Sequence, residues 1–445
     1  MRRCRFAIYA ALLCASSPLL AQHETRMQHP GNGPNGVPET VFLTHRLGTD
    51  HAEGISTIDV DGDGFLDVLS GAYWYKNPGA NGGEWKQHQW RTVPVHGEFV
   101  SDCGEGVVDV NHDGLPDVVT AGWITNGAYW YENPGKAGVT SGAMWKKHFI
   151  GDSFDTEGGA FADINGDGKP DLALAHYNHS GLLWIDFSGA QPRMHQLTPK
   201  DADGHGVGVA DIDGDGRADL LTPSGWFRNL DATTDKWEWH PDWKLGDAGF
   251  PILGYDVDGD GRTDLIVGQG HGYGLYWYKQ GGPKDKPTWT RNIIDESFSQ
   301  SHALKLVDID GDGVPELVTG KRYRGHNGND PGSYDPVALF YYRLDRSTAR
   351  WTRTTISTNG TAGAGTQILA EDFDHDGDLD LATAGKLGVH FIENLRISKV
   401  PNETREAQQP LERKWPFPGE GPEVQQEDGP ATRHVNDAVI PPAQP

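Results

Sequence analysis

Short acidic segments recur along the chain and contain the side chains of a calcium-binding loop. The pattern Asp-x-Asp/Asn-x-Asp-Gly-x-x-Asp/Glu occurs seven times. Positions 1, 3, 5 and 9 supply side-chain oxygens and position 7 a backbone carbonyl, while the glycine at position 6 permits a positive φ. Oxygen ligands without cysteine or histidine favour Ca²⁺ over zinc. We therefore expect up to seven structural calcium sites.

The expected ligands occupy the same five positions in every copy. They are Asp59, Asp61, Asp63, Phe65 and Asp67; Asp109, Asn111, Asp113, Leu115 and Asp117; Asp163, Asn165, Asp167, Lys169 and Asp171; Asp211, Asp213, Asp215, Arg217 and Asp219; Asp256, Asp258, Asp260, Arg262 and Asp264; Asp308, Asp310, Asp312, Val314 and Glu316; and Asp372, Asp374, Asp376, Asp378 and Asp380. Without a counter-ion these clustered carboxylates repel one another, so calcium should stabilise the fold.

A second set of reactive side chains lies six positions before the first residue of each acidic loop. The residues there are, in chain order, Glu53, Cys103, Glu157, His205, Phe250, His302 and Thr366. If equivalent positions of the repeat converge on one axis, carboxylates and imidazoles form a ring that holds a divalent metal or transfers protons. The alternative is that these groups are solvated at the mouth of a channel and do no chemistry.

Further reactive residues fall in segments expected at the same end of the molecule. Histidines recur there, and the longest insertion adds cations and a tyrosine; the residues include His51, His176, His179, His271, Lys321, Arg322, Tyr323, His326 and Asp330. Long loops with mixed charges and aromatic residues are more often functional than filler.

The segments between the acidic loops have the pattern of short strands. An aromatic strand follows most loops, at residues 72–77, 128–133, 182–187, 275–280, 339–344 and 389–394. Successive loops lie 45 to 64 residues apart, which is the length of a four-stranded unit. Four strands in each of seven repeats predict an all-β, seven-bladed β-propeller. The last repeat lacks a fourth strand, so we expect the N-terminal segment 42–47 to complete it and close the ring.

The composition excludes several classes of protein. The 445 residues carry a formal net charge of −25, which disfavours nucleic acid and anionic membranes as partners. No internal stretch reaches the roughly 18 apolar residues that a membrane-spanning helix needs. We expect a monomer.

The N-terminus has the pattern of a secretory signal peptide. Basic residues precede an apolar run from Phe6 to Leu20, which ends at the small residue Ala21. We therefore assign residues 1–21 to a signal peptide and expect a secreted or periplasmic protein. The mature chain then keeps Cys103 as its one cysteine and forms no internal disulfide.

The remaining boundaries follow from composition. Residues 22–38 are a polar linker rich in Gly and Pro, and residues 39–397 form the propeller. Residues 398–445 are rich in Pro, Gln and Glu and lack strand patterns, so we expect them to be disordered.

The acidic loops and the blade pattern resemble FG-GAP repeats, also called VCBS repeats, which form the propeller of integrin α-chains and of many secreted bacterial proteins. The blade sequences are also similar to the propeller portion of aldos-2-ulose dehydratase. Proteins of this kind include adhesins, sugar-binding proteins and carbohydrate lyases. The resemblance implies a calcium-stabilised propeller that binds carbohydrate in an axial funnel and acts on it by elimination. The alternative is a non-catalytic propeller that binds a glycan or a protein.

Elimination requires a base, a cation that holds an enolate, and an acid. The candidate bases are His205, His302 and His176, and the candidate acid is Tyr323. Glu53, Glu157, Lys321 and Arg322 complete the set of candidate catalytic residues, and the funnel is also a candidate site for an additional divalent metal.

Overall fold

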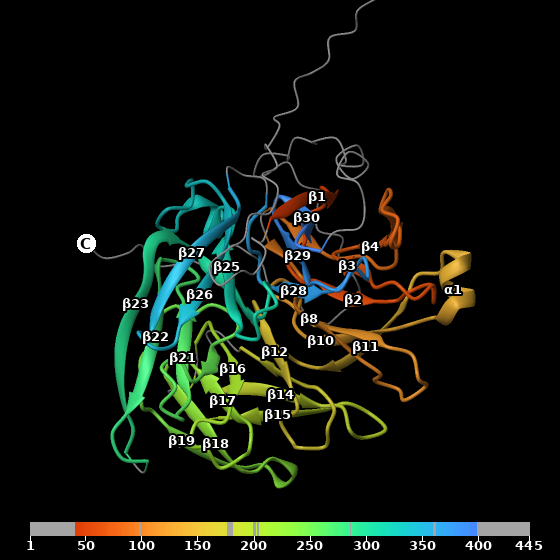
Figure 1. The fold of residues 1–445 in the computed structure, drawn as a ribbon. Coiled ribbons are helices and arrows are strands. Elements are labelled where there is room, and N and C mark those ends of the chain that lie inside the picture. Colours follow the sequence, from red (N-terminus) through yellow and green to blue (C-terminus); the bar gives the residue numbers. More distant parts are fainter. Residues whose placement is uncertain are drawn as a thin grey trace, which may run out of the picture.

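Antiparallel sheets arranged in a ring make up the described part of the chain. The computed structural model describes residues 41–397 apart from 98, 176–180, 199–201, 203, 285 and 359–361. Within these residues the strands form seven four-stranded sheets, which follow one another around the ring in chain order (Figure 1). The predicted seven-bladed β-propeller is confirmed. The predicted signal peptide, linker and tail, and the candidate base His176, lie outside the described residues.

Each of the first six blades is a meander whose strands are neighbours in the chain. Blades one to three consist of β2 (Ser56–Ile58), β3 (Asp67–Ser70), β4 (Tyr73–Lys76) and β5 (Lys86–Gln89); β8 (Cys103–Val108), β9 (Asp117–Ala121), β10 (Ala128–Glu132) and β11 (Lys146–Gly151); and β12 (Gly159–Ala162), β13 (Asp171–Leu174), β14 (Leu182–Asp186) and β15 (Arg193–Leu197). Blades four to six consist of β16 (Gly208–Ala210), β17 (Asp219–Thr222), β18 (Gly225–Asp231) and β19 (Lys236–His240); β20 (Leu253–Tyr255), β21 (Asp264–Gly268), β22 (Tyr273–Gly281) and β23 (Thr288–Ser299); and β24 (Ser301–Val307), β25 (Glu316–Lys321), β26 (Ala338–Asp345) and β27 (Arg350–Ser357).

The seventh blade joins the two ends of the propeller. It consists of β28 (Ile368–Glu371), β29 (Asp380–Gly385), β30 (Gly388–Asn394) and the N-terminal strand β1 (Phe42–Gly48). β1 pairs antiparallel with β30, from Phe42 opposite Asn394 to Arg46 opposite His390. This pairing confirms the predicted closure, and it covers the edge that β30 would otherwise expose.

The core lies between neighbouring blades. One cluster joins Val119 and Trp130 of blade two to Leu172 and Ile185 of blade three, and all four side chains are buried. Because each blade is covered on both faces, its second strand is apolar on both faces, and β9 is buried over its whole length. Aromatic residues of the third strands fill the space between the sheets.

Few elements depart from the blade pattern in the described residues. They are the short hairpin β6 (Val95–His96) and β7 (Phe99–Val100), the helix α1 (Gly135–Ser141) at the rim, and the 3₁₀ turns η2 (Ala232–Thr234) and η3 (Gly325–Gly328). No helix among the described residues is both long and apolar enough to cross a membrane.

The topology places the acidic loops and the predicted funnel at opposite ends of the ring. Each acidic loop joins the first strand of a blade to the second, as residues 59–66 join β2 to β3. The segments that enter the first strands and the turns between second and third strands lie at the other end, because neighbouring strands are antiparallel.

Candidate functional site

The backbone of each acidic loop wraps around its first aspartate. In blade one, the amides of Asp63 and Gly64 donate to the two carboxylate oxygens of Asp59, at 3.0 and 2.9 Å. The equivalent pair of hydrogen bonds recurs in the other six loops. Gly64 takes a φ of +94°, which a side chain would resist. The loops therefore have one common shape.

The carboxylate at position 9 anchors the loop to the third strand. In blade one, Asp67 accepts hydrogen bonds from the amides of Val60 and Asn77, at 2.9 and 2.8 Å, and is fully buried. Burial raises the pKa of Asp67 to about 7, and the charge of Asp61 adds to the shift. Keeping Asp67 ionised in this buried position is therefore unfavourable without a further positive charge beside it.

The loops fit calcium by the chemistry of their donors. Carboxylate oxygens of Asp59, Asp61 and Asp67 lie within 4.8 Å of one another. The Oδ1 atoms of Asp61 and Asp258 are buried and have no hydrogen-bond partner among the described residues. Unpaired oxygens among oxygen-only donors suit a hard cation such as Ca²⁺. Occupancy of the loops by calcium stays a prediction.

Four side chains converge at the other end of the ring. Glu157 precedes β12, His205 precedes β16, His271 lies between β21 and β22, and His302 is the second residue of β24. The Nε2 atom of His205 lies 2.8 Å from Nε2 of His271 and 3.3 Å from Nε2 of His302. Oε2 of Glu157 contacts His205 and lies 3.5 Å from Nε2 of both His271 and His302. We call these four residues the three-histidine cluster.

The outer ring nitrogens set the orientation of two imidazoles. Nδ1 of His205 donates to the carbonyl oxygen of Ala248 at 2.8 Å. Nδ1 of His271 donates to Oδ2 of Asp330 at 2.9 Å. In the neutral tautomer that carries the proton on Nδ1, the lone pair of each Nε2 would point into the cluster, as it does in histidine ligands of metals. Asp330 belongs to the long insertion of blade six, where it also pairs with His326 at 2.8 Å.

Charge in the cluster is balanced by the blade-six insertion. Nη1 of Arg322 lies 3.5 Å from Oε1 of Glu157. Burial alone would raise the pKa of Glu157, but Arg322 and His205 hold it well below its usual value. Burial and the charge of Arg322 keep the pKa of His302 well below its usual value. At neutral pH the cluster therefore presents an ionised carboxylate and a neutral His302 imidazole.

Three segments of the chain match the profile of the FG-GAP-like repeat, at residues 109–174, 163–222 and 256–319. The chain contains FG-GAP-like repeats. The matched segments cover acidic loops of blades two to six, and the remaining blades of this FG-GAP propeller repeat the same architecture.

Several solved structures are similar to this chain at low identity. The exotype rhamnogalacturonan lyase YesX is 14% identical over 82% of this chain and 74% of that chain, with a TM-score of 0.42. Rhamnogalacturonan lyase PL11 of Bacillus licheniformis is 14% identical over 82% and 74%, with a TM-score of 0.41. The V. cholerae biofilm matrix protein Bap1 is 12% identical over 82% and 89%, with a TM-score of 0.39. Likeness at this level carries no information on substrate. No curated protein sequence matches the chain.

The FG-GAP propeller brings some of the predicted funnel residues together and separates others. Glu157, His205, His302 and Arg322 meet as described above. Lys321 lies at the edge of this group, where its Nζ donates to Oε1 of Gln300 at 2.9 Å. Tyr323 is half-buried, and no hydrogen bond, ion pair or ring contact joins it to the three-histidine cluster among the described residues.

Glu53 lies in a neighbouring group on blades one and two. Its Oε1 is 3.8 Å from Nε2 of His51, and its Oε2 is 3.8 Å from Sγ of Cys103. Burial alone would raise the pKa of Glu53, but the nearby imidazole of His51 and the charges of Lys386 and Arg322 lower it. The charge of Arg322 thus lowers the pKa of both Glu53 and Glu157 and couples the two groups electrostatically.

His271 is the member of the cluster that is missing from the predicted catalytic set. The ring position of blade five holds Phe250, whose ring packs against those of His205 and His302 at centroid distances of 4.9 and 5.3 Å. His271 comes from the next turn of the same blade and supplies the imidazole that Phe250 cannot. The signal was present, because His271 is in a turn expected at this end of the ring.

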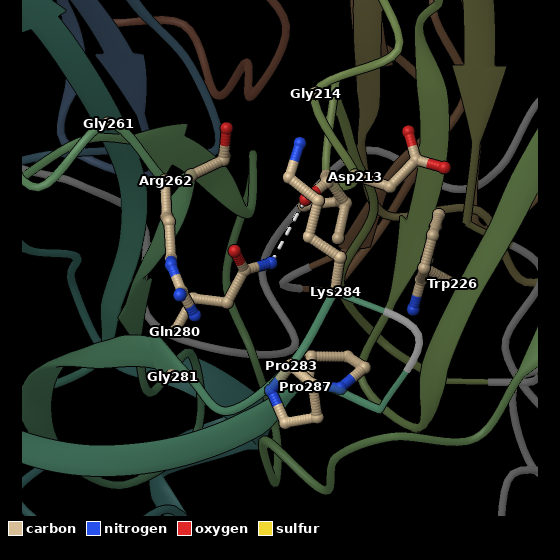
Figure 2. A pocket seen from close by; sticks show the side chains of 12 residues that line it. Asp213, Gly214, Trp226, Gly261, Arg262, Gln280, Gly281, Pro283, Lys284 and Pro287 are labelled. Carbon is tan, nitrogen blue, oxygen red and sulfur yellow. Dashed lines mark hydrogen bonds between the residues drawn. The ribbon is translucent and has the colours of Figure 1, made fainter.

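Two cavities lie apart from the three-histidine cluster. The axial channel contains a cavity of about 560 Å³, lined by first-strand residues of every blade, among them Glu105, Phe161 and Leu306. A smaller pocket lies between blades four and five, beside the fourth acidic loop, and is lined by Asp213, Arg262 and other residues (Figure 2). Neither cavity includes a residue of the cluster.

Proposed function

We propose that this FG-GAP propeller is a secreted, calcium-stabilised protein that binds a divalent transition metal in the three-histidine cluster and acts there on a carbohydrate by elimination. The convergence of three Nε2 atoms and one carboxylate oxygen carries this proposal. The alternative, a propeller that binds a glycan or a protein without catalysis, uses the same end of the ring and needs no metal.

The spacing of the four donor atoms supports a shared metal ion. Atoms bound at about 2.0–2.2 Å to one ion lie about 2.8–3.6 Å from one another in octahedral or tetrahedral geometry. The Nε2 atoms of His205 and His271 are 2.8 Å apart, and those of His205 and His302 are 3.3 Å apart. Three imidazoles and one carboxylate suit zinc, manganese or iron better than calcium.

The chemistry follows from the charges around the cluster. A bound divalent metal would act as a Lewis acid that stabilises an oxyanion on the substrate. Arg322 adds a second positive charge beside Glu157, so a sugar that carries a carboxylate would be favoured. In the elimination, a base removes the proton next to the carboxylate, the bond from the β-carbon to oxygen breaks, and the departing oxygen takes up a proton.

The assignment of the base changes once the metal is included. The Nε2 lone pairs of His205 and His302 face the shared centre and are not available to a substrate proton. Glu53 remains ionised, because the nearby His51 and the charges of Lys386 and Arg322 lower its pKa despite burial. We therefore propose Glu53 as the base, with His51 as the group that accepts its proton.

Exposed aromatic side chains at the same end of the ring support a carbohydrate ligand. Tyr334 in the blade-six insertion is 76% exposed, and the guanidinium of Arg324 lies 5.6 Å from its ring. Tyr273 at the start of β22 is 43% exposed and donates to Asp335 at 2.7 Å. Large exposed aromatic rings next to polar groups are suited to stack on sugar rings.

The decisive experiment combines metal analysis with a test for product. We expect the purified chain to contain close to one equivalent of a transition metal, which His302→Ala removes. Incubation with oligosaccharides that contain uronic acids should produce an ultraviolet-absorbing double bond. Glu53→Gln should abolish the product and keep the metal.

Two outcomes would count against the proposal. A chain without transition metal, also after incubation with zinc or manganese, would remove the basis for the centre. Sugar binding without product in the metal-loaded protein would favour the non-catalytic alternative. Melting temperatures of both variants in calcium serve as the control for folding.

A further inference from the structure

The residue at the end of each third strand differs in charge between blades. It directly precedes the residue whose amide binds the position-9 carboxylate, as Lys76 precedes Asn77 in blade one. Blades one, four, five and six have a cation there, whereas blades two, three and seven have an acid; the residues in blade order are Lys76, Glu132, Asp186, Arg228, Lys279, Arg343 and Glu393.

The four cations reach into the acidic loops of their own blades. Lys76 contacts the carboxylates of Asp61 and Asp63. Lys279 contacts those of Asp258 and Asp260.

The two arginines do the same in their blades. Nε of Arg228 lies 2.5 Å from Oδ2 of Asp213, and Nε of Arg343 lies 2.6 Å from Oδ2 of Asp310. In each of these four loops the cation contacts position 3, one of the expected calcium ligands.

A second cation approaches each of these loops from the next blade. Arg346 lies 3.3 Å from Oδ2 of Asp256 in loop five. Lys284 approaches loop four at Gly214 (Figure 2). Its Nζ lies 3.7 Å from the position that a Cβ atom would occupy if Gly214 had a side chain. Lys136 and Arg396 approach loops one and six in the same way, beside Gly62 and Gly311.

Loops two and three are built differently. Asparagine replaces aspartate at position 3, and in loop three Nδ2 of Asn165 donates to Oδ1 of Asp186 at 3.2 Å. Glu132 of blade two turns to the outer strand, where it pairs with His148 at 2.7 Å. No ion pair between a lysine or arginine and the carboxylates of these two loops occurs in the described residues.

We propose that the acidic loops fall into two classes with different calcium dependence. Loops one, four, five and six carry their own cations, which neutralise the carboxylates when calcium is absent and reduce the attraction for calcium. Loops two and three carry no such cation, so they bind calcium more tightly and lose their structure without it. Loop seven, whose Glu393 pairs with His45 at 3.0 Å, is assigned to neither class.

The physical reason is the competition for the same oxygens. The carboxylates at positions 3 and 5 cannot be fully shared between a side-chain cation and Ca²⁺. Each cation that the chain itself places in a loop therefore weakens the binding of calcium to that loop. Exposed ion pairs are individually weak, but here two cations act on one loop. This inference rests on the calcium part of the proposed function and is independent of the three-histidine cluster.

Hydrogen exchange measured by mass spectrometry on the full chain tests the two classes separately. After calcium is removed by a chelator, protection should fall by about tenfold or more in residues 109–117 and 163–171, and much less in residues 59–67 and 256–264. The variant Lys279→Met leaves Arg346 beside Asp256, so protection in residues 256–264 should become clearly more calcium-dependent than in the wild type without reaching the level of loops two and three. The control Lys236→Met removes an exposed lysine that contacts no acidic loop, and it should change nothing.

The outcomes separate the inference from the calcium sites themselves. Equal loss of protection in all seven loops, or an unchanged loop five in Lys279→Met, would overturn the two classes while leaving calcium binding intact. No change in any loop after chelation would overturn the calcium sites as well, and the two classes with them.

Discussion

Asp330 offers a direct test of the proposed metal centre, because it touches a ligand without being one. Its Oδ2 accepts from Nδ1 of His271 at 2.9 Å, and its Oδ1 accepts from Nδ1 of His326 at 2.8 Å. Burial alone would raise the pKa of Asp330, but the hydrogen bonds from the two histidines hold it well below its usual value. Asp330 is therefore ionised at neutral pH and would make His271 a stronger ligand of the proposed metal.

The variant Asp330→Asn keeps the size of the side chain and one acceptor oxygen, but it removes the charge. Partners of this kind change metal affinity by about 10- to 100-fold, which is about 1.4–2.7 kcal/mol. Competition with a coloured chelator measures the affinity, and the visible spectrum of the Co²⁺-loaded protein reports on ligand geometry. We expect weaker binding with an altered cobalt spectrum.

A matched control lies in the same insertion. Asp335 accepts from the hydroxyl of Tyr273 at 2.7 Å and is exposed, so Asp335→Asn should leave metal affinity unchanged. Equal affinities in the wild type and Asp330→Asn would refute the role of His271 as a ligand. Equal losses in both variants would indicate a general effect of the insertion and not of the hydrogen bond.

Three further predictions concern the stability of the ring. Burial raises the pKa of Asp67 and of Asp219 to about 7 in the metal-free fold. The protonated carboxyl groups therefore stabilise the folded state at low pH, and this contribution is lost as the pH rises from about 4 to above 7. Calcium should therefore raise the melting temperature more at pH 8 than at pH 5, and an equal shift at both would contradict the loop assignment. Deletion of residues 22–48 removes β1 and exposes the edge of β30, so the truncated chain should aggregate or fail to fold, whereas a soluble monomer would argue against closure. The carboxylate of Glu105 is fully buried and lies 2.5 Å from the guanidinium of Arg91. Arg91→Ala removes this cation, so chemical denaturation should show that the free energy of unfolding falls by about 3–5 kcal/mol.

The blade architecture was predictable because its signals are local and repeated. The acidic loop fixes where a first strand ends and a second begins, and the aromatic run fixes the third strand, as in Tyr73–Lys76. The partner of β30 also followed from counting, since the last repeat was one strand short. A single short strand is difficult to assign from its own sequence, but the same pattern in every repeat supports each assignment.

The composition of the three-histidine cluster was only partly predictable, for a geometric reason. Alignment of the repeats found Glu157, His205 and His302, because equivalent positions converge on the axis. The same alignment gave Phe250 in blade five and could not show that His271, about twenty residues later, turns into the gap. Glu53 occupies an equivalent position as well, yet the intervening Cys103 places it in the neighbouring group.

The proposed calcium loops and the proposed metal centre lie at opposite ends of the first strands. In blade three, Glu157 lies six residues before Asp163, so one short strand, β12, links the three-histidine cluster to the third acidic loop. The cluster draws its four residues from four consecutive blades, and the distances between them therefore depend on how closely those blades pack. A substitution within an acidic loop can reach the cluster only by moving a whole strand, whereas a substitution of a cluster ligand leaves the loops untouched. This separation lets a repeated, structural motif be combined with a site that no single repeat contains.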